Sequence, residues 1–179
     1  MSSRVQLHTL SPNDRDEFID AMAQSRSFHA EWISAPATPA EFDALLRRAE
    51  DESFVSLVIR LREDGRLAGV FNISEIVRGA FQSAYIGYGG VAGLEGNGYM
   101  TEGMGLVLDH AFGELGLHRL EANIQPENTA SIALARRCGF VREGFSERYL
   151  RIGGEWRDHE RWAIRAELWE ELRGADDPD

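Results

Sequence analysis

Cysteine is almost absent from this sequence, since Cys138 is the only one among 179 residues. A single cysteine excludes an intrachain disulfide and any metal site made of several cysteines. Long apolar runs are also absent. None approaches the ~20 residues that span a bilayer, and the N-terminus lacks a signal-peptide pattern. We therefore expect a cytoplasmic protein that makes no use of a membrane.

Positive charge is scarce, because 19 Lys and Arg residues stand against 30 Asp and Glu residues. The net charge of −11 argues against binding nucleic acid through a basic surface. It favours small or peptidic partners that carry positive charge, although the same excess could simply serve solubility. The five histidines form no metal or triad pattern, so we expect no metal and interpret His159 as structural.

The chain length suits one domain over residues 1–179 with a full hydrophobic core. Hydrophobic residues make up 43% of the chain and charged residues 27%, which are ordinary values for a globular protein. No internal repeat, linker or low-complexity segment is present. The acidic end, about residues 174–179, is expected to be frayed.

Two glycines lie near the middle of the chain, in the stretch Gly96-Asn97-Gly98-Tyr99-Met100-Thr101-Glu102. An alternating run at Ala84–Tyr88 predicts a strand before it, and apolar residues at helical spacing predict a helix after it. Those helical residues are Met104, Val107, Leu108, Ala111 and Leu115. A strand, a glycine loop and a helix start leave backbone N–H groups available to an anion such as phosphate. The alternative is a glycine turn that only changes chain direction.

Two familiar phosphate loops do not fit this stretch. A dinucleotide fingerprint needs a third glycine where Thr101 stands. A P-loop ends in Gly-Lys followed by Ser or Thr, and no such ending is present. A phosphate site here would therefore be of another kind.

The N-terminal part predicts one strand and two helices. Residues 4–10 alternate as a strand, and Ser11-Pro12 is typical of a helix start, with Phe18 and Met22 inward. Thr38-Pro39-Ala40-Glu41 is a capping box that opens a second helix. Its inward residues are expected to be Phe42, Leu45, Leu46 and Ala49.

The remainder predicts strands with one short helix between them. The strands are expected at residues 54–61, 67–76, 120–125, 141–152 and 155–164, with hairpin turns at Asp64-Gly65 and Gly153-Gly154. A helix begins after Pro126-Glu127-Asn128 and ends at Gly139. With the strand and helix around the glycine stretch, the order is βααβββαβαββ.

Five fragments in the second half carry a family resemblance. They are Gly98–Glu102, Pro126–Asn128 with Ser131, Arg137–Phe140, Glu143–Phe145, and Tyr149–Gly154 continuing to Trp156–His159. In this order the chain resembles the GNAT N-acetyltransferase superfamily, and within it the RimJ/RimL-type ribosomal-protein N-acetyltransferases. The family loop is Gln/Arg-x-x-Gly-x-Gly/Ala, and aligned on Gly98 it places Glu95 and Met100 at its two ends.

The resemblance implies an α+β fold, with a central mixed, mostly antiparallel twisted sheet of about seven strands and about four flanking helices. It also implies transfer of an acetyl group from acetyl-CoA to a primary amine. The strands near residues 88–92 and 120–125 would splay apart to admit the pantetheine. The implied acetyl-CoA-binding residues are Gly90, Val91, Ala92, Gly96, Asn97, Gly98, Tyr99, Met100, Thr101, Asn123, Asn128 and Ser131.

The catalytic assignments compete with structural ones. Asn128 is a helix cap or a partner of pantetheine, and Ser131 is a helix-start residue or the group that assists the leaving thiolate. Glu75 is an exposed strand residue or the general base that some family members carry. Leu150 stands where a RimL-type enzyme would carry its proposed glutamate, so a water relay is the alternative. Glu102, in the first helical turn, is interpreted as pairing with the helix dipole.

The acceptor is expected to be a protein N-terminal α-amine. A small amine such as a polyamine, amino acid or antibiotic is the alternative, and a third hypothesis is an acyl-CoA-binding regulatory module without turnover. Phe28 and Trp32 belong to an aromatic segment that is either core filling or the wall of a substrate cleft, and Tyr149 and Trp156 would complete that cleft. An exposed strand in the C-terminal hairpin could support a homodimer.

Overall fold

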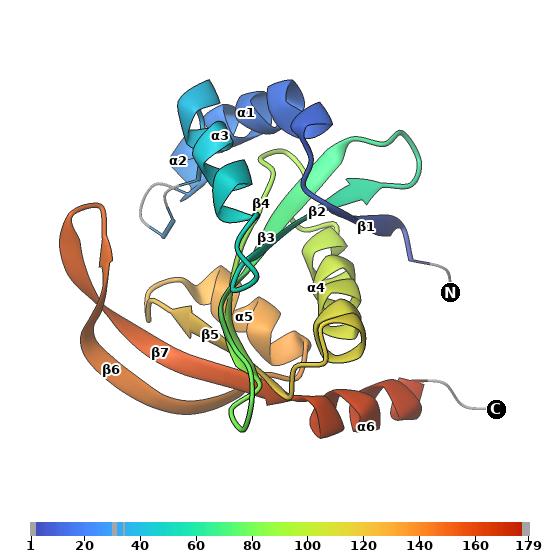
Figure 1. Cartoon of the computed structure of the whole chain (residues 1–179), viewed down its shortest axis with the longest axis vertical. Helices are drawn as coiled ribbons and strands as arrows, with labels where there is room; N and C mark the ends of the chain where they lie inside the picture. Colours follow the sequence, from blue (N-terminus) through green and yellow to red (C-terminus); the bar gives the residue numbers. More distant parts are fainter. Residues whose placement is uncertain (1–2, 30–31, 34, 177–179) are drawn as a thin grey trace.

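The computed structural model describes residues 3–29, 32–33 and 35–176, and a seven-stranded sheet forms its centre (Figure 1). In space the strands follow the order β1-β2-β3-β4-β5-β7-β6, and only β4 and β5 are parallel neighbours. The strands are β1 (Val5–Thr9), β2 (Val55–Leu61), β3 (Leu67–Val77), β4 (Ser83–Gly90), β5 (Arg119–Ile124), β6 (Val141–Ile152) and β7 (Glu155–Arg165). The predicted mixed, mostly antiparallel α+β architecture is confirmed.

Six α-helices accompany the sheet, where about four were expected. They are α1 (Arg15–Gln24), α2 (Arg26–His29), α3 (Pro39–Arg48), α4 (Tyr99–Asp109), α5 (Thr129–Arg137) and α6 (Ala166–Asp176). A 3-10 turn, η1 (Pro12–Asp14), precedes α1, and a π-helical segment, η2 (His110–Glu114), extends α4. The two helices that were not predicted are α2 and α6. Helix α6 includes residues 174–176 of the expected frayed end, and residues 177–179 lie outside the described part of the chain.

The helix starts follow capping signals within the sequence. Thr38 Oγ1 accepts the Glu41 N–H at 3.3 Å, while the Glu41 carboxylate accepts the Ala37 N–H at 2.9 Å. Asn128 Oδ1 caps α5 by accepting the Ser131 N–H at 3.1 Å. These side chains satisfy N–H groups that have no partner inside the helix, which is why the local signals predicted both starts.

Two apolar clusters lie on opposite faces of the sheet. On β2, Leu57 and Ile59 belong to the larger cluster and Val58 to the smaller. Because successive strand side chains point to opposite faces, this alternation separates the two clusters. Helices α4 and α5 supply residues to the larger cluster, and α1 and α3 to the smaller. The hairpin of β6 and β7 curls outward beyond the helices (Figure 1).

The parallel strands β4 and β5 separate after a short contact. They pair only from Ser83–Tyr85 with Arg119–Glu121, although β4 continues to Gly90 and β5 to Ile124. On its other side β4 stays paired with β3 as far as Gly90. The expected splay between these strands is therefore present, and it opens the sheet near the glycine stretch.

Candidate active site

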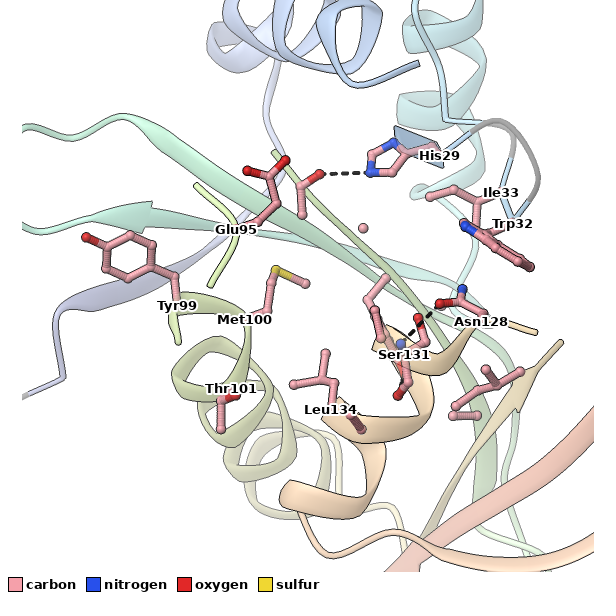
Figure 2. A pocket seen from close by; sticks show the side chains of 18 of the residues that line it. His29, Trp32, Ile33, Glu95, Tyr99, Met100, Thr101, Asn128, Ser131 and Leu134 are labelled. Carbon is pink, nitrogen blue, oxygen red and sulfur yellow. Dashed lines mark hydrogen bonds between the residues drawn. The ribbon is translucent and has the colours of Figure 1, made fainter. Parts of the chain in front are cut away.

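A cavity of about 750 Å³ lies at this opening (Figure 2). Its walls come from α2, the end of β4, the glycine stretch, the start of α4, the end of β5, α5 and β7. Met100 and Ser131 point into it from α4 and α5, while His29 and Trp32 face it from the other side (Figure 2). One continuous space thus joins the glycine stretch to the outer hairpin.

The glycine stretch forms one end of the cavity. Gly98 has φ +83° and is the N-cap of α4, and its carbonyl accepts the N–H groups of Thr101 at 3.0 Å and Glu102 at 3.1 Å. The N–H groups of Tyr99 and Met100 have no earlier helical carbonyl to bond. With the positive end of the helix dipole, they form an anion cradle, a helix-start arrangement that suits phosphate groups.

Arg4, which the sequence analysis did not single out, ties this loop to β1. Its backbone N–H and its Nε each donate to the Glu102 carboxylate at 2.7 Å, and its Nη2 donates to the Asn97 carbonyl at 2.8 Å. Burial would raise the pKa of Glu102, but the bonds from Arg4 outweigh it and lower that pKa. Glu102 therefore serves as an anchor for Arg4, beyond the expected pairing with the helix dipole.

Met100 and Glu95 stand at the two ends of the family loop. The long side chain of Met100 is accommodated by a glycine, Gly69 of β3. Any other residue at position 69 would place its Cβ atom only 2.5 Å from Met100 Sδ. Glu95 Oε2 accepts the Gly93 N–H at 2.8 Å and keeps a carboxylate beside the anion cradle. A bound phosphate would therefore meet one like charge at this loop.

The edge expected to pair with pantetheine is already partly bonded within the chain. The Val91 N–H donates to the Ala68 carbonyl at 3.1 Å, and the Ala92 N–H donates to Ser25 Oγ at 2.9 Å. His29 Nε2 lies 2.8 Å from the Gly90 carbonyl, so that nitrogen carries the proton. Burial lowers the pKa of His29, which keeps the ring neutral. Gly90 and Val91 line the cavity and Ala92 does not.

Asn128 and Ser131 both line the cavity while taking part in the cap of α5. The structural and ligand-binding interpretations of these residues are therefore compatible in space. The Ser131 carbonyl accepts a bond from the buried Tyr88 hydroxyl at 3.3 Å. Burial raises the pKa of Tyr88, so this phenol stays protonated and holds the helix start in place.

Other candidate residues divide between the cavity and the surface. Phe28 and Trp32 line the cavity, with Phe28 43% exposed, which fits the cleft wall rather than core filling. Tyr149 and Trp156 do not line it, and Trp156 is 61% exposed on the hairpin. Glu75 does not line the cavity, and its exposed carboxylate pairs with Arg48 at 3.4 Å.

The remaining predicted residues are placed as follows. Gly96, Gly98, Tyr99, Met100, Thr101 and Asn123 line the cavity, and Asn97 does not. His159 also lines it, although the sequence suggested a purely structural role. Among the described residues, no group of three or more His, Cys, Asp or Glu side chains could hold a metal ion, and no helix is long and apolar enough to cross a membrane.

Known proteins resemble this chain in sequence. Residues 4–141 match the family described as Acetyltransferase (GNAT) domain. The chain is 32% identical over 171 residues to Probable N-acetyltransferase YjcK of Bacillus subtilis, which covers 89% of this chain and 93% of that protein. It is 36% identical over 107 residues to the ribosomal protein uS5-alanine N-acetyltransferase of Escherichia coli, which covers 60% of this chain and 55% of the relative.

Solved structures share the fold. RimJ of Mycobacterium smegmatis, in complex with CoA-disulfide, has a TM-score of 0.83 at 30% identity over 96% of this chain and 89% of that one. Spermidine N-acetyltransferase of Vibrio cholerae, with CoA and spermine, has a TM-score of 0.80 at 21% identity over 93% and 98%. The family match and the near full-length relative show that this chain belongs to the GNAT acetyltransferase family, as an N-acetyltransferase that uses acetyl-CoA.

Proposed function

We propose that the acetyl acceptor is the N-terminal α-amine of a protein, bound together with acetyl-CoA in a ternary complex. The observation that carries this proposal is one continuous cavity. It has the anion cradle at one end and the aromatic residues Phe28 and Trp32 at the other. The relatives named for RimJ and for ribosomal protein uS5-alanine acetylation support the same class of acceptor.

The proposed reaction uses the two ends of the cavity together. Backbone N–H groups at the start of α4 hold the pyrophosphate, and residues around Asn128 hold the pantetheine. A neutral amine then attacks the thioester carbonyl, which the shared cavity places within reach. Ser131 lies in the first turn of α5, where its hydroxyl would donate a proton to the departing thiolate.

Charge supports a basic peptide as the acceptor. The net charge of −11 attracts a cationic chain, and that attraction weakens as salt rises. An α-amine has a reference pKa near ~8, whereas a lysine lies near ~10.4, so the α-amine is neutral far more often at physiological pH. We therefore expect transfer to the α-amine in preference to lysine side chains.

Mass spectrometry with acetyl-CoA and a peptide panel tests this proposal. The panel holds short basic peptides with a free N-terminus, the same peptides with a blocked N-terminus, and polyamines. We expect modification of the free peptides only, with a rate that falls as salt is added. Efficient turnover of polyamines alone, or of blocked peptides, would replace the proposed acceptor, and binding of acetyl-CoA without any turnover would favour a regulatory module.

A homodimer through the outer hairpin belongs to the same proposal. Strand β6 is an edge of the sheet and carries exposed apolar side chains, including Phe145 and Leu150. A second copy could add a strand there and cover these side chains. Sedimentation of the whole chain at several concentrations would detect the dimer, and a constant monomer mass would contradict it.

A further inference from the structure

Two neighbouring residues of the cavity, Asn123 and His159, each carry a hydrogen-bond acceptor without a donor among the described residues. His29 Nδ1 on the other side of the cavity is a further such acceptor, and Arg161 Nε, opposite Asn123, is a buried donor without a partner. Asn123 Oδ1 is buried without a partner. His159 is 3% exposed, and only its Nδ1 is bonded, at 2.9 Å to the Arg157 carbonyl. Both residues line the cavity. Buried polar atoms are nearly always paired, so the unpaired Asn123 Oδ1 indicates a missing donor, and His159 Nε2, which lines the same cavity without a bond, can share that donor.

The bond to Arg157 decides the state of the His159 ring. A carbonyl can only accept, so Nδ1 carries the proton and the neutral ring leaves a lone pair on Nε2. Burial lowers the pKa of His159, although the Arg157 carbonyl and the Asp158 carboxylate act in the opposite direction. The unbonded nitrogen is thus a base at neutral pH.

The sheet places these two acceptors side by side. Asn123 on β5 is directly opposite Arg161 on β7, so His159, two residues earlier on β7, is its diagonal neighbour. Their Cα atoms are then roughly 7–8 Å apart, within reach of one bridging group. Both lie on the face opposite Ala122 and Trp162, which belong to the larger apolar cluster with α4 and α5.

We propose that Asn123 and His159 form the subsite for the acceptor amine, and that His159 is the catalytic base. The inference rests on the amine acetylation proposed above and applies to any primary amine. An ammonium group has three N–H donors, so it can satisfy Asn123 Oδ1 and His159 Nε2 together. Asn123 then orients the amine and is reassigned here from the acetyl-CoA-binding set.

The proton balance of the step is complete. His159 Nε2 takes one proton from the ammonium, and the freed lone pair forms the new C–N bond at the thioester carbonyl. As the C–S bond breaks, the second proton of the tetrahedral intermediate passes through the Ser131 hydroxyl to the departing thiolate. The products are the amide, CoA thiol and one proton, which the imidazolium releases to solvent.

Several charged and titratable groups lie around His159 and can influence its pKa. Tyr149 of β6 packs against the ring, with centroids 6.2 Å apart. The other groups on the same face or in adjoining positions are Tyr85 of β4, Glu121 of β5, and Arg157, Asp158 and Arg161 of β7. The bond to Tyr85 and, after it, burial raise the pKa of Tyr149 to about 12, so Tyr149 stays neutral near physiological pH.

The pH profile of kcat/KM tests the base. For wild type, log kcat/KM should be level between the pKa of His159 and the pKa of the amine, because the ammonium and the neutral ring react together, and it should fall with a slope of one below the pKa of His159. In His159→Gln the slope should instead be one everywhere below the pKa of the amine, with a loss of about 10²–10³-fold near neutral pH. The acetyl-CoA Kd should stay unchanged. His118→Gln, an exposed histidine paired with Glu167, is the control and should match wild type. A His159→Gln rate near that of wild type overturns the proposal.

Two further measurements do not depend on that variant folding. Nitrogen NMR of the wild-type ring should find Nδ1 protonated and Nε2 unprotonated, and the reverse tautomer overturns the base. Asn123→Ala should raise the amine KM about tenfold with acetyl-CoA Kd unchanged. A raised acetyl-CoA Kd instead would return Asn123 to the cofactor site. If no amine is acetylated, the proposed function fails, while the tautomer still tests His159 separately.

Discussion

At the scale of single residues, the loop departs from its family pattern in two ways with different consequences. Met100 replaces a small residue, and Gly69 opposite it leaves room for the longer side chain. Glu95 replaces a neutral or basic residue, and no described cation neutralises it, because its recorded bond is to the Gly93 N–H. The Met100 side chain is accommodated by the space that Gly69 leaves, whereas Glu95 leaves a negative charge beside the anion cradle.

Glu95→Gln should therefore tighten acetyl-CoA binding. The amide keeps an oxygen for the Gly93 N–H and removes the repulsion, which is worth about 0.5–1 kcal/mol at an exposed site, or roughly two- to fivefold in Kd. Calorimetry at low and high salt would measure it, with the gain shrinking at high salt. Acetyl-pantetheine, which lacks the pyrophosphate, is the control ligand and should bind both variants alike. An equal acetyl-CoA Kd would show that Glu95 lies too far from the phosphates to matter.

Ser131→Ala should lower kcat by about ten- to a thousand-fold, because the thiolate would leave without its proton donor. Acetyl-CoA binding should change little, since the Asn128 cap uses the backbone N–H of residue 131 and not its hydroxyl. Thr129→Ala is the matched control, because Thr129 is in the same first turn of α5 but does not line the cavity. Normal turnover of Ser131→Ala would leave this serine with a purely structural role.

At the scale of elements, short contacts hold the end of α1 and helix α2 against the end of β4. Ser25 Oγ, at the end of α1, accepts the Ala92 N–H, and His29 of α2 bonds the Gly90 carbonyl. A Cβ atom at Gly89 would lie 2.9 Å from Ile33 Cδ1, so the segment after α2 packs directly on the strand. The aromatic wall of the cavity is positioned by these contacts.

A second anchor joins η1 to β2, and it should make stability depend on pH. Arg60 donates to Asp14 at 2.6 Å and to Glu17 at 2.7 Å. Burial would raise the pKa of Asp14, but the bonds from Arg60 and Ser11 outweigh it and lower that pKa. The bonded carboxylate therefore stabilises the fold above its unfolded pKa of ~3.9, and this contribution is lost as pH falls through the lower folded value.

Asp14→Asn should destabilise the protein by about 1–2 kcal/mol at neutral pH, because a charge-assisted bond becomes a neutral one. The difference from wild type should begin to shrink below about pH 4, where the carboxyl of the unfolded wild-type chain takes up a proton, and it should disappear only below the lower pKa of the folded state. Urea unfolding at pH 7 and pH 3.5 would measure it. Asp43→Asn breaks an exposed pair with Arg15 and should cost less than about 1 kcal/mol. If both variants lose the same free energy of unfolding at pH 7, the Asp14–Arg60 pair contributes no more than an exposed ion pair.

At the scale of the whole molecule, the cavity proposed to hold the two substrates lies where β4 and β5 separate. Helices α4 and α5 pack on one face of the sheet, and the opposite face carries Asn123 and His159 beside the outer hairpin. Helix α6 joins the first face, because Trp169 Nε1 donates to Asp109 of α4 at 2.8 Å. The net charge of the whole chain is −11, which suits a cationic acceptor more than it suits an anionic cosubstrate.

Acetyl-CoA should raise the melting temperature of the whole chain. A ligand that binds only the native state, at about 100 times its Kd, adds about 2.7 kcal/mol. For a domain of this size that corresponds to roughly 5–11 °C. Thermal denaturation with acetyl-CoA would measure the shift, and acetyl-pantetheine should give a smaller one. Equal shifts for the two ligands would remove the pyrophosphate cradle from the binding site.

The sequence alone determined the features that depend on near neighbours. The Thr38 and Asn128 caps, the Asp64-Gly65 turn and the alternation of the strands each involve residues only a few positions apart. These signals and the family motifs were enough to predict the sheet, the splay and the glycine loop. Helix α6 was missed, because its place depends on docking to Asp109 of α4.

Only the tertiary structure decided which distant side chains share the cavity. Arg4 meets Glu102 across 98 positions of sequence, and His29 meets Gly90 across 61. Asn123 and His159 become neighbours through the register of β5 and β7, which a shift of one residue would turn to opposite faces. Glu75, which the sequence offered either as an exposed strand residue or as a base, lies outside the cavity on β3 and pairs with Arg48. Local patterns record periodicity and caps, whereas the identity of a base depends on long-range register that no short pattern contains.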